Sequence, residues 1–163
     1  MSAAITNGQV PRQRNTRSGV VHRRLQIDLT SSRPAPDVVI VHVRGEIDML
    51  TAPELQSTVA DQAHPPPRLL VIGLRAVTFL GASGLAALLD IGDAAARTAT
   101  SMRLVCDTPV VTRPLEILGL REVFVMFAGL HAALAGVRRH PGSVLRCARA
   151  RSRLAEEPVR SRR

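Results

Sequence analysis

One stretch in the middle of the chain, Val77 to Leu89, restricts the fold more than any other. An apolar run at 77–80 ends in a group of small residues, and a helical pattern follows at once. Leu85, Leu88 and Leu89 repeat at i, i+3 and i+4, which is one face of a helix. The stretch therefore indicates an apolar segment that passes into an amphipathic helix within a few residues.

Ser83 lies where this helix is expected to begin. Serine is favoured at the N-cap because its side-chain oxygen accepts hydrogen bonds from the free N–H groups of the first turn. The neighbours Gly81, Ala82 and Gly84 carry almost no side chain, so another protein should reach the hydroxyl easily. The positive end of the helix dipole also suits an added phosphate. A plain helix cap without regulation is the alternative interpretation of Ser83.

Hydrophobic patterns predict the other elements. Strands are expected at 25–29, 38–43, 69–72, 102–106 and 123–127, with a turn at 31–37. Helices are expected at 51–62, 83–98, 108–119 and 129–137, the first opened by a capping box of Thr51 and Glu54. The order ββαβαβαβα indicates the α/β class, with a mixed sheet of about five strands and about four helices packed mainly on one face.

Charge divides the chain into three parts. Residues 1–24 carry +5, residues 25–137 carry −3 and residues 138–163 carry +7, so the net charge of +9 comes from the ends. We expect a domain at 25–137 between a disordered basic N-terminal tail and an Arg-rich C-terminal tail. The C-terminal tail is expected to be a solvated, disordered end. Nucleic-acid binding and membrane contact by this tail are weaker alternatives.

The usual motifs of catalysis and of cofactor or metal binding are absent from the sequence. It contains no phosphate-binding glycine loop and no HExxH, GxSxG or CxxC motif. Cys106 and Cys147 do not form a metal or disulfide framework by their spacing. No apolar run approaches the roughly 18 residues of a membrane span. We therefore expect a cytoplasmic protein that is not an enzyme and has no cofactor, metal or membrane partner.

Four short motifs, in order, resemble a known family. They are 45–48 followed by 51–55, then 71–74, then 77–85 and finally 118–120. Together they resemble the STAS domain, and more closely the bacterial anti-sigma factor antagonists. The resemblance covers residues 25–137 and implies the STAS fold.

The resemblance implies a partner-switching mechanism. The dephosphorylated antagonist binds an anti-sigma factor, a serine kinase of the histidine-kinase-like ATPase type, and so releases a sigma factor. The kinase phosphorylates the serine before the Gly-Leu pair, which is Ser83 here, and a serine phosphatase restores the cycle. The partner surface is expected to comprise Asp48 (in a surface loop near Ser83), Thr51, Gly81, Ala82, Ser83, Gly84, Leu85 and Leu88. For Leu85 and Leu88 a core position is an equally good interpretation.

The sequence departs from the family pattern just before the serine. The usual triplet before Gly-Leu is Asp-Ser-Ser, whereas this chain has Gly81-Ala82-Ser83. Slow or absent phosphorylation would make the protein a constitutive antagonist or one that answers another signal. A STAS module in a stress-sensing or ligand-sensing complex is a second alternative, and a nucleic-acid-binding protein acting through its Arg-rich tails is a third.

Overall fold

The computed structural model describes residues 27–135. The strands are β1 (Asp28–Ala35), β2 (Val38–Ile47), β3 (Leu69–Leu80), β4 (Ser101–Val105) and β5 (Val125–Phe127). The helices are α1 (Ala52–Gln62), α2 (Ala82–Arg97), α3 (Pro109–Ile117) and α4 (Leu130–Leu134). The predicted element order is confirmed. The two predicted tails, Cys147 and Val137 lie outside the described residues.

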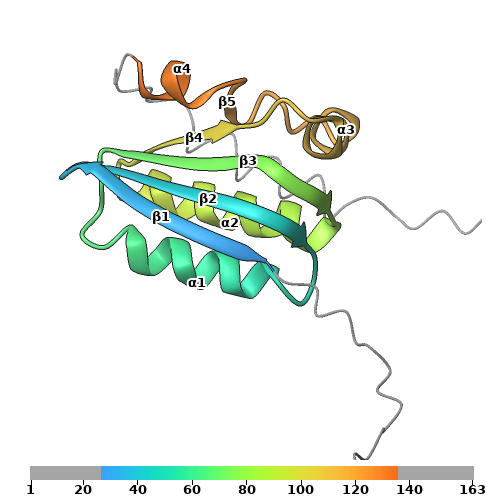
Figure 1. Ribbon diagram of the computed structural model, residues 1–163, viewed down its shortest axis with the longest axis horizontal. Coiled ribbons are helices and arrows are strands. Elements are labelled where there is room, and N and C mark those ends of the chain that lie inside the picture. Colours follow the sequence, from blue (N-terminus) through green and yellow to red (C-terminus); the bar gives the residue numbers. More distant parts are fainter. Residues whose placement is uncertain (1–26, 136–163) are drawn as a thin grey trace, which may run out of the picture.

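The five strands form one mixed sheet in the order β1-β2-β3-β4-β5 (Figure 1). β1 runs antiparallel to β2, and the other neighbouring strands are parallel to each other. Each parallel connection passes through a helix, as parallel strands require. The carboxyl ends of β2 and β3 therefore lie at the same edge of the sheet, with Ile47 opposite Leu80. The predicted mixed α/β sheet is confirmed.

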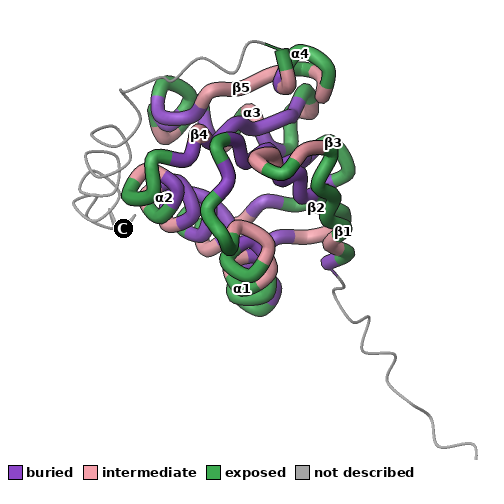
Figure 2. Tube along the Cα trace, turned by 90° about the vertical axis from the view of Figure 1, so that its left-hand side faces the viewer, coloured by how far each residue is buried: buried purple, intermediate pink, exposed green. Residues whose placement is uncertain are grey.

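Two apolar clusters hold the layers together. The larger cluster joins one face of the sheet to α1, α2 and α3, through residues such as Leu55, Leu88 and Leu115. The smaller cluster lies on the other face, where Ala133 of α4 packs with Val71 and Val105. Three of the four described helices thus cover one face, as predicted. Figure 2 shows the buried residues concentrated in the sheet and on the inner sides of the helices.

The turn predicted at 31–37 is wrong, because β1 continues to Ala35 and only Pro36 and Asp37 form the turn to β2. β1 is an edge strand and mostly exposed, so polar residues and Pro34 are tolerated in it without alternating apolar residues. The prediction that 38–43 is buried on both faces is also wrong at one position, since His42 is exposed.

β3 is longer than the predicted strand at 69–72. It extends to Leu80 because β2 also extends to Ile47, and the two strands pair along their whole length with two register shifts. The apolar run at 77–80 is therefore the end of a central strand. Residues that follow it are placed at the edge of the sheet where β2 also ends.

A buried arginine on β4 fastens α4 to the sheet. Arg103 donates hydrogen bonds to the carbonyl oxygens of Ala133 and Ala135, and its guanidinium lies 5.4 Å from the centre of the Phe127 ring. The last carbonyl groups of a helix have no N–H partner within the helix, and charge-assisted hydrogen bonds of this kind satisfy them. No local pattern around Arg103 predicts that this strand residue is buried.

Candidate functional site

The loop between β2 and α1 is held by a compact set of hydrogen bonds. A side-chain oxygen of Asp48 accepts from the backbone N–H groups of Leu50 at 2.8 Å and Thr51 at 3.0 Å. The Thr51 hydroxyl donates to the carbonyl oxygen of Glu46 at 2.7 Å and accepts from the N–H of Asp48 at 2.9 Å. Every one of these bonds closes the loop on itself, so the loop has a defined conformation before any partner arrives.

Thr51 occupies the N-cap of α1 as predicted, but the predicted capping box is wrong. Its side chain makes no hydrogen bond to the first turn of the helix, because it points back to the end of β2. The residue is 4% exposed, so it supports the loop from inside. Thr51, which the sequence predicted on the partner surface, is therefore buried beneath this surface in the structure.

Asp48 lies in this loop and is partly exposed, as the sequence predicted. The hydrogen bonds from the backbone of Leu50 and then of Thr51 lower the pKa of the Asp48 carboxyl below its ordinary value of 3.8. The carboxylate is therefore ionised at neutral pH and places a fixed negative charge at the sheet edge.

α2 begins one residue earlier than predicted. Gly81 is the N-cap, and its N–H donates to the carbonyl oxygen of Ile47 at 2.9 Å. Ser83 is therefore the second residue of the helix, and the prediction that it caps the helix is wrong. No side chain caps this helix and no acidic residue lies in its first turn. Ser83 is partly exposed and Ala82 is exposed, so the hydroxyl can be approached from solvent.

Gly84 brings the first turn of α2 into direct contact with the end of β2. A Cβ added at this position would lie 2.7 Å from the carbonyl oxygen of Ile47 and 2.8 Å from the Leu80 side chain. Any other residue would push the helix away from the sheet. Gly84, Leu85 and Leu88 are all buried, so the prediction that Gly84 lies on the partner surface is wrong, and for Leu85 and Leu88 the core interpretation is the correct one.

Exposed apolar side chains that were not among the predicted partner-binding residues surround this edge. Met49 is 74% exposed, Leu50 is 72% exposed and Phe79 is 50% exposed. A Cβ added at Gly81 would lie 3.2 Å from the Phe79 ring, so this ring lies against the start of α2. We call residues 47–51 and 79–84 the Ser83 edge. Large apolar side chains exposed together mark an interaction surface.

Comparison with known families identifies the domain. The STAS domain model matches residues 31–133. The chain belongs to the STAS domain family. The resemblance seen in the sequence motifs is thereby confirmed.

Two groups of relatives support this assignment of the STAS domain. Over 101 residues the chain is 36% identical to the anti-sigma-F factor antagonist RsfB of Mycobacterium tuberculosis, and the match covers 62% of this chain and 82% of that protein. The crystal structure of an anti-sigma factor antagonist from Mycobacterium paratuberculosis superposes with a TM-score of 0.64 at 34% identity, over 71% of this chain and 97% of that one.

A more distant structure shares the fold alone. The Bacillus cell fate determinant SpoIIAA, in its phosphorylated form, matches with a TM-score of 0.55 at 17% identity, over 68% of this chain and all of that one.

Within residues 27–135, the other features to consider are metal binding, the Cys106 thiol and helices that could span a membrane. No group of three or more His, Cys, Asp or Glu side chains in this range is arranged to hold a metal ion. Burial, and then the neighbouring Asp107 carboxylate, raises the pKa of the Cys106 thiol to about 11, which keeps it protonated. No helix in the described part of the chain is long and apolar enough to cross a membrane.

Proposed function

We propose that this STAS protein is an anti-sigma factor antagonist that binds an anti-sigma factor through the Ser83 edge and is switched off by phosphorylation of Ser83. The observation that carries the proposal is a partly exposed serine in the first turn of α2, a helix whose N-cap Gly81 lies against the exposed Phe79 ring. The similarity to antagonists from two mycobacteria supports the assignment of this role.

The Ser83 edge has the composition of a protein-binding surface. Met49, Leu50 and Phe79 offer apolar area, and the hydrogen-bonded loop from Asp48 to Thr51 presents two of them without a large loss of conformational entropy on binding. The partner would be an anti-sigma factor that is also a serine kinase, since the same contact would then bring its active site to Ser83.

Phosphorylation would change the charge of this surface at its centre. A phosphoserine carries about −1.5 to −2 charges at pH 7. The N–H groups of the first turn of α2 have no acceptor within the helix, so they can stabilise the phosphate in the free protein. In a complex the same charge would be desolvated among apolar side chains, at a cost of several kcal/mol. A loss of about 3 kcal/mol corresponds to more than a hundredfold in affinity.

The departure from the family triplet now has a structural position. Gly81, which replaces the usual acid, is the N-cap of α2. An acid here would compete with a phosphate for the same N–H groups, whereas glycine leaves them open. We therefore propose that Ser83 remains a phosphorylation site in this chain.

The first experiment measures phosphate transfer. Purified anti-sigma factor kinases from the source organism are incubated with ATP and the full chain, and modified residues are located by mass spectrometry. We expect one phosphate, on Ser83, and none on the Ser83→Ala variant. Ser57 is exposed on α1, so Ser57→Ala serves as the matched control and should be modified normally. Equal modification of wild type and Ser83→Ala would contradict the proposal.

The second experiment measures binding. Ser83→Glu should weaken the complex with the anti-sigma factor by about a hundredfold, while Ser57→Glu should change it less than about threefold. Titration calorimetry gives both values. A partner that binds wild type and Ser83→Glu with the same affinity would show that the Ser83 edge is not the contact.

The protein would act in the cytoplasm by binding alone, without catalysis, and a serine phosphatase would return it to its binding state. A domain at 25–137 would carry this function, with the Arg-rich segments at 1–24 and 138–163 as tails.

A further inference from the structure

A hollow lies on the face of the sheet opposite α1 and α2. Its volume is about 370 Å³, which is in the range of small-molecule sites, roughly 300–1,000 Å³. Four neighbouring strands, β1 to β4, and the short helix α4 contribute residues to its lining. α4 packs against β4 and β5, whereas Thr30 and His42, which line the hollow from β1 and β2, are exposed. This part of the sheet is therefore open to solvent.

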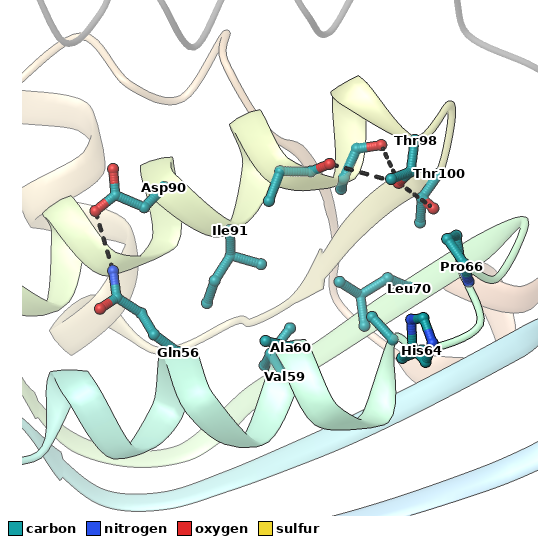
Figure 3. Close-up of a pocket in the computed structure, with 13 residues that line it drawn as sticks. Gln56, Val59, Ala60, His64, Pro66, Leu70, Asp90, Ile91, Thr98 and Thr100 are labelled. Carbon is teal, nitrogen blue, oxygen red and sulfur yellow. Dashed lines mark hydrogen bonds between the residues drawn. The ribbon is translucent and has the colours of Figure 1, made fainter.

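A second space, also of about 370 Å³, lies between α1 and α2 and differs in its polar groups (Figure 3). There the side-chain amide of Gln56 donates to a carboxylate oxygen of Asp90 at 3.0 Å, and the hydroxyls of Thr98 and Thr100 lie 3.0 Å apart. Most of its polar side chains are thus paired within the fold, and the rest of its lining is mainly apolar. The hollow on the open face has the polar groups that a ligand could use.

A glycine forms the floor of the hollow on the open face. Thr30, His42, Gly73 and Val105 are successive register partners, so they form one row across β1 to β4. A Cβ added at Gly73 would lie 2.8 Å from Nδ1 of His42. Because this position carries no side chain, the imidazole ring lies over the backbone of β3. The hollow also reaches Val105 and Leu130, which give it an apolar wall.

Two opposite charges lie beside this row. Asp28 of β1 and Arg44 of β2 are register partners in an antiparallel pair, where facing Cβ atoms are about 5 Å apart. Both line the hollow and both are exposed. Within residues 27–135 neither side chain makes a hydrogen bond or an ion pair. The carboxylate and the guanidinium are therefore both open to a ligand.

Arg75 of β3 adds a guanidinium that is already held in place. Its Nε donates to Oδ1 of Asp107 at 3.1 Å, and its Nη2 lies 2.9 Å from Oδ2 of the same carboxylate. This pairing leaves other N–H groups of the guanidinium unused, and guanidinium groups hold carboxylates by parallel hydrogen bonds. Arg44 and Arg75 are balanced in charge by Asp28 and Asp107. The hollow therefore suits a ligand that carries both charges more than an ion of one sign.

We propose that the hollow on the open sheet face binds a free α-amino acid with an apolar side chain. Its carboxylate lies between Arg44 and Arg75, and its ammonium group lies beside Asp28. Its side chain packs on Val105 and Leu130. An α-amino acid carries both charges around a single carbon atom, which matches two facing residues of opposite charge. The site would give the STAS domain a small-molecule input in addition to its protein partner.

The test uses L-leucine as the probe, with isocaproate and isoamylamine as analogues that carry only the acid or only the amine. Each is titrated into the ¹⁵N-labelled full chain and followed by amide chemical shifts. We expect saturable shifts around Thr30, Arg44, Gly73 and Leu130. Because the charges that line the hollow are exposed, the dissociation constant should be on the order of 1 mM for leucine, and about tenfold weaker for either analogue.

Charge variants test the two polar contacts separately. Arg44→Gln and Asp28→Asn should each weaken leucine binding about tenfold. Asp28→Asn should leave isocaproate binding unchanged, because this analogue has no ammonium group. Arg97→Gln and Asp61→Asn, exposed on α2 and α1 across the sheet, are the matched controls and should bind leucine as wild type does.

A further comparison tests the apolar wall. L-Alanine keeps both charges but lacks most of the side chain, so it should bind about tenfold more weakly than leucine. Leu130→Ala should weaken leucine binding about fivefold and leave alanine binding unchanged.

Three results would overturn the proposal. They are no saturable shift with 20 mM leucine (on the order of twenty times the expected constant), shifts confined to the space between α1 and α2, and unchanged leucine binding by both Arg44→Gln and Asp28→Asn. Circular dichroism melting shows whether each variant is folded, and if one of the two charge variants fails to fold, the other decides.

Discussion

The first turns of α1 and α2 lie at the same edge of the sheet but are completed in different ways. At α1 the Asp48 carboxylate and the Thr51 hydroxyl form hydrogen bonds with the backbone groups of the preceding loop. The N–H of Ala52 donates to the Asp48 carbonyl oxygen at 2.9 Å, and Glu54 is an acidic residue in the first turn. At α2 a glycine stands at the N-cap and no acidic residue follows in the first turn, and neither helix has a side-chain cap.

This difference means that the polar groups at the start of α1 are used within the fold, whereas the start of α2 is available to an added group. The polar groups at α1 are already used, so an added anion there would find few donors and a nearby carboxylate. The first turn of α2 is positioned by backbone packing through Gly84 rather than by polar side chains, and its N–H groups stay open. Of the two, α2 is thus suited to receive a phosphate.

The largest loss of stability is expected at Gly84, where the position of α2 depends on packing. Gly84→Val places atoms within about 3 Å of Ile47 and Leu80, and it should lower the free energy of unfolding by about 3 kcal/mol. Ala86→Val, exposed on the same helix, should cost less than about 1 kcal/mol. Urea unfolding measures both. Equal losses would mean that the helix start tolerates displacement from the sheet.

A smaller loss is expected where α1 depends on hydrogen bonds. Thr51→Val keeps the volume but leaves the Glu46 carbonyl and the Asp48 N–H without their partner, and should cost about 2 kcal/mol. Thr58→Val, partly buried in the same helix, should change stability by less than about 0.5 kcal/mol. Equal losses of unfolding free energy for the two variants, measured by urea unfolding, would mean that the loop hydrogen bonds do not stabilise the fold.

A charge in the first turn of α2 should stabilise the protein. Ser83→Asp is expected to raise the free energy of unfolding by about 0.5 kcal/mol at low salt, because it meets the positive end of the helix dipole. The same change at Ser57, in the middle of α1, should give no gain. The gain should disappear in 1 M salt, where the screening length is about 3 Å. A gain that persists there would contradict a dipole effect.

The smallest effect concerns pH. Because the folded-state pKa of Asp48 is lowered from 3.8, its carboxylate stabilises the fold above pH 3.8, and this contribution is lost as the pH falls through the lower value. Asp48→Asn should therefore lose less stability than wild type below pH 3.8. Melting temperatures at a series of pH values test this, and carbon-detected titration of Asp48 should give a midpoint below 3.8.

The sequence predicted the fold well because the core segments are strongly patterned. The order of elements, the mixed sheet and the helix start at Thr51 all follow from local patterns that the tertiary structure keeps. The wrong predictions concern residues whose structure depends on a neighbouring strand or on exposure at the edge of the sheet. Ser83 is not the N-cap because pairing with β2 extends β3 to Leu80, and β1 lacks an apolar pattern because it is an exposed edge.

The candidate site was predicted in part. The helical pattern that begins at Ser83 and the motif around Asp48 predict these two residues, whereas the sequence leaves Leu85 and Leu88 open between surface and core, and both are buried. Exposure of Phe79 could not be predicted, since its apolar neighbours in the sequence face the core. Which face a residue at a strand end occupies depends on register shifts, and two such shifts occur between β2 and β3.

The carbonyl group of Ile47 joins the end of β2 to the start of α2. It accepts the N–H of Gly81, and the backbone of Gly84 lies directly against it, with no side chain between strand and helix. Because one carbonyl group sets both where β2 ends and where α2 begins, these two segments keep a single relative position in the fold.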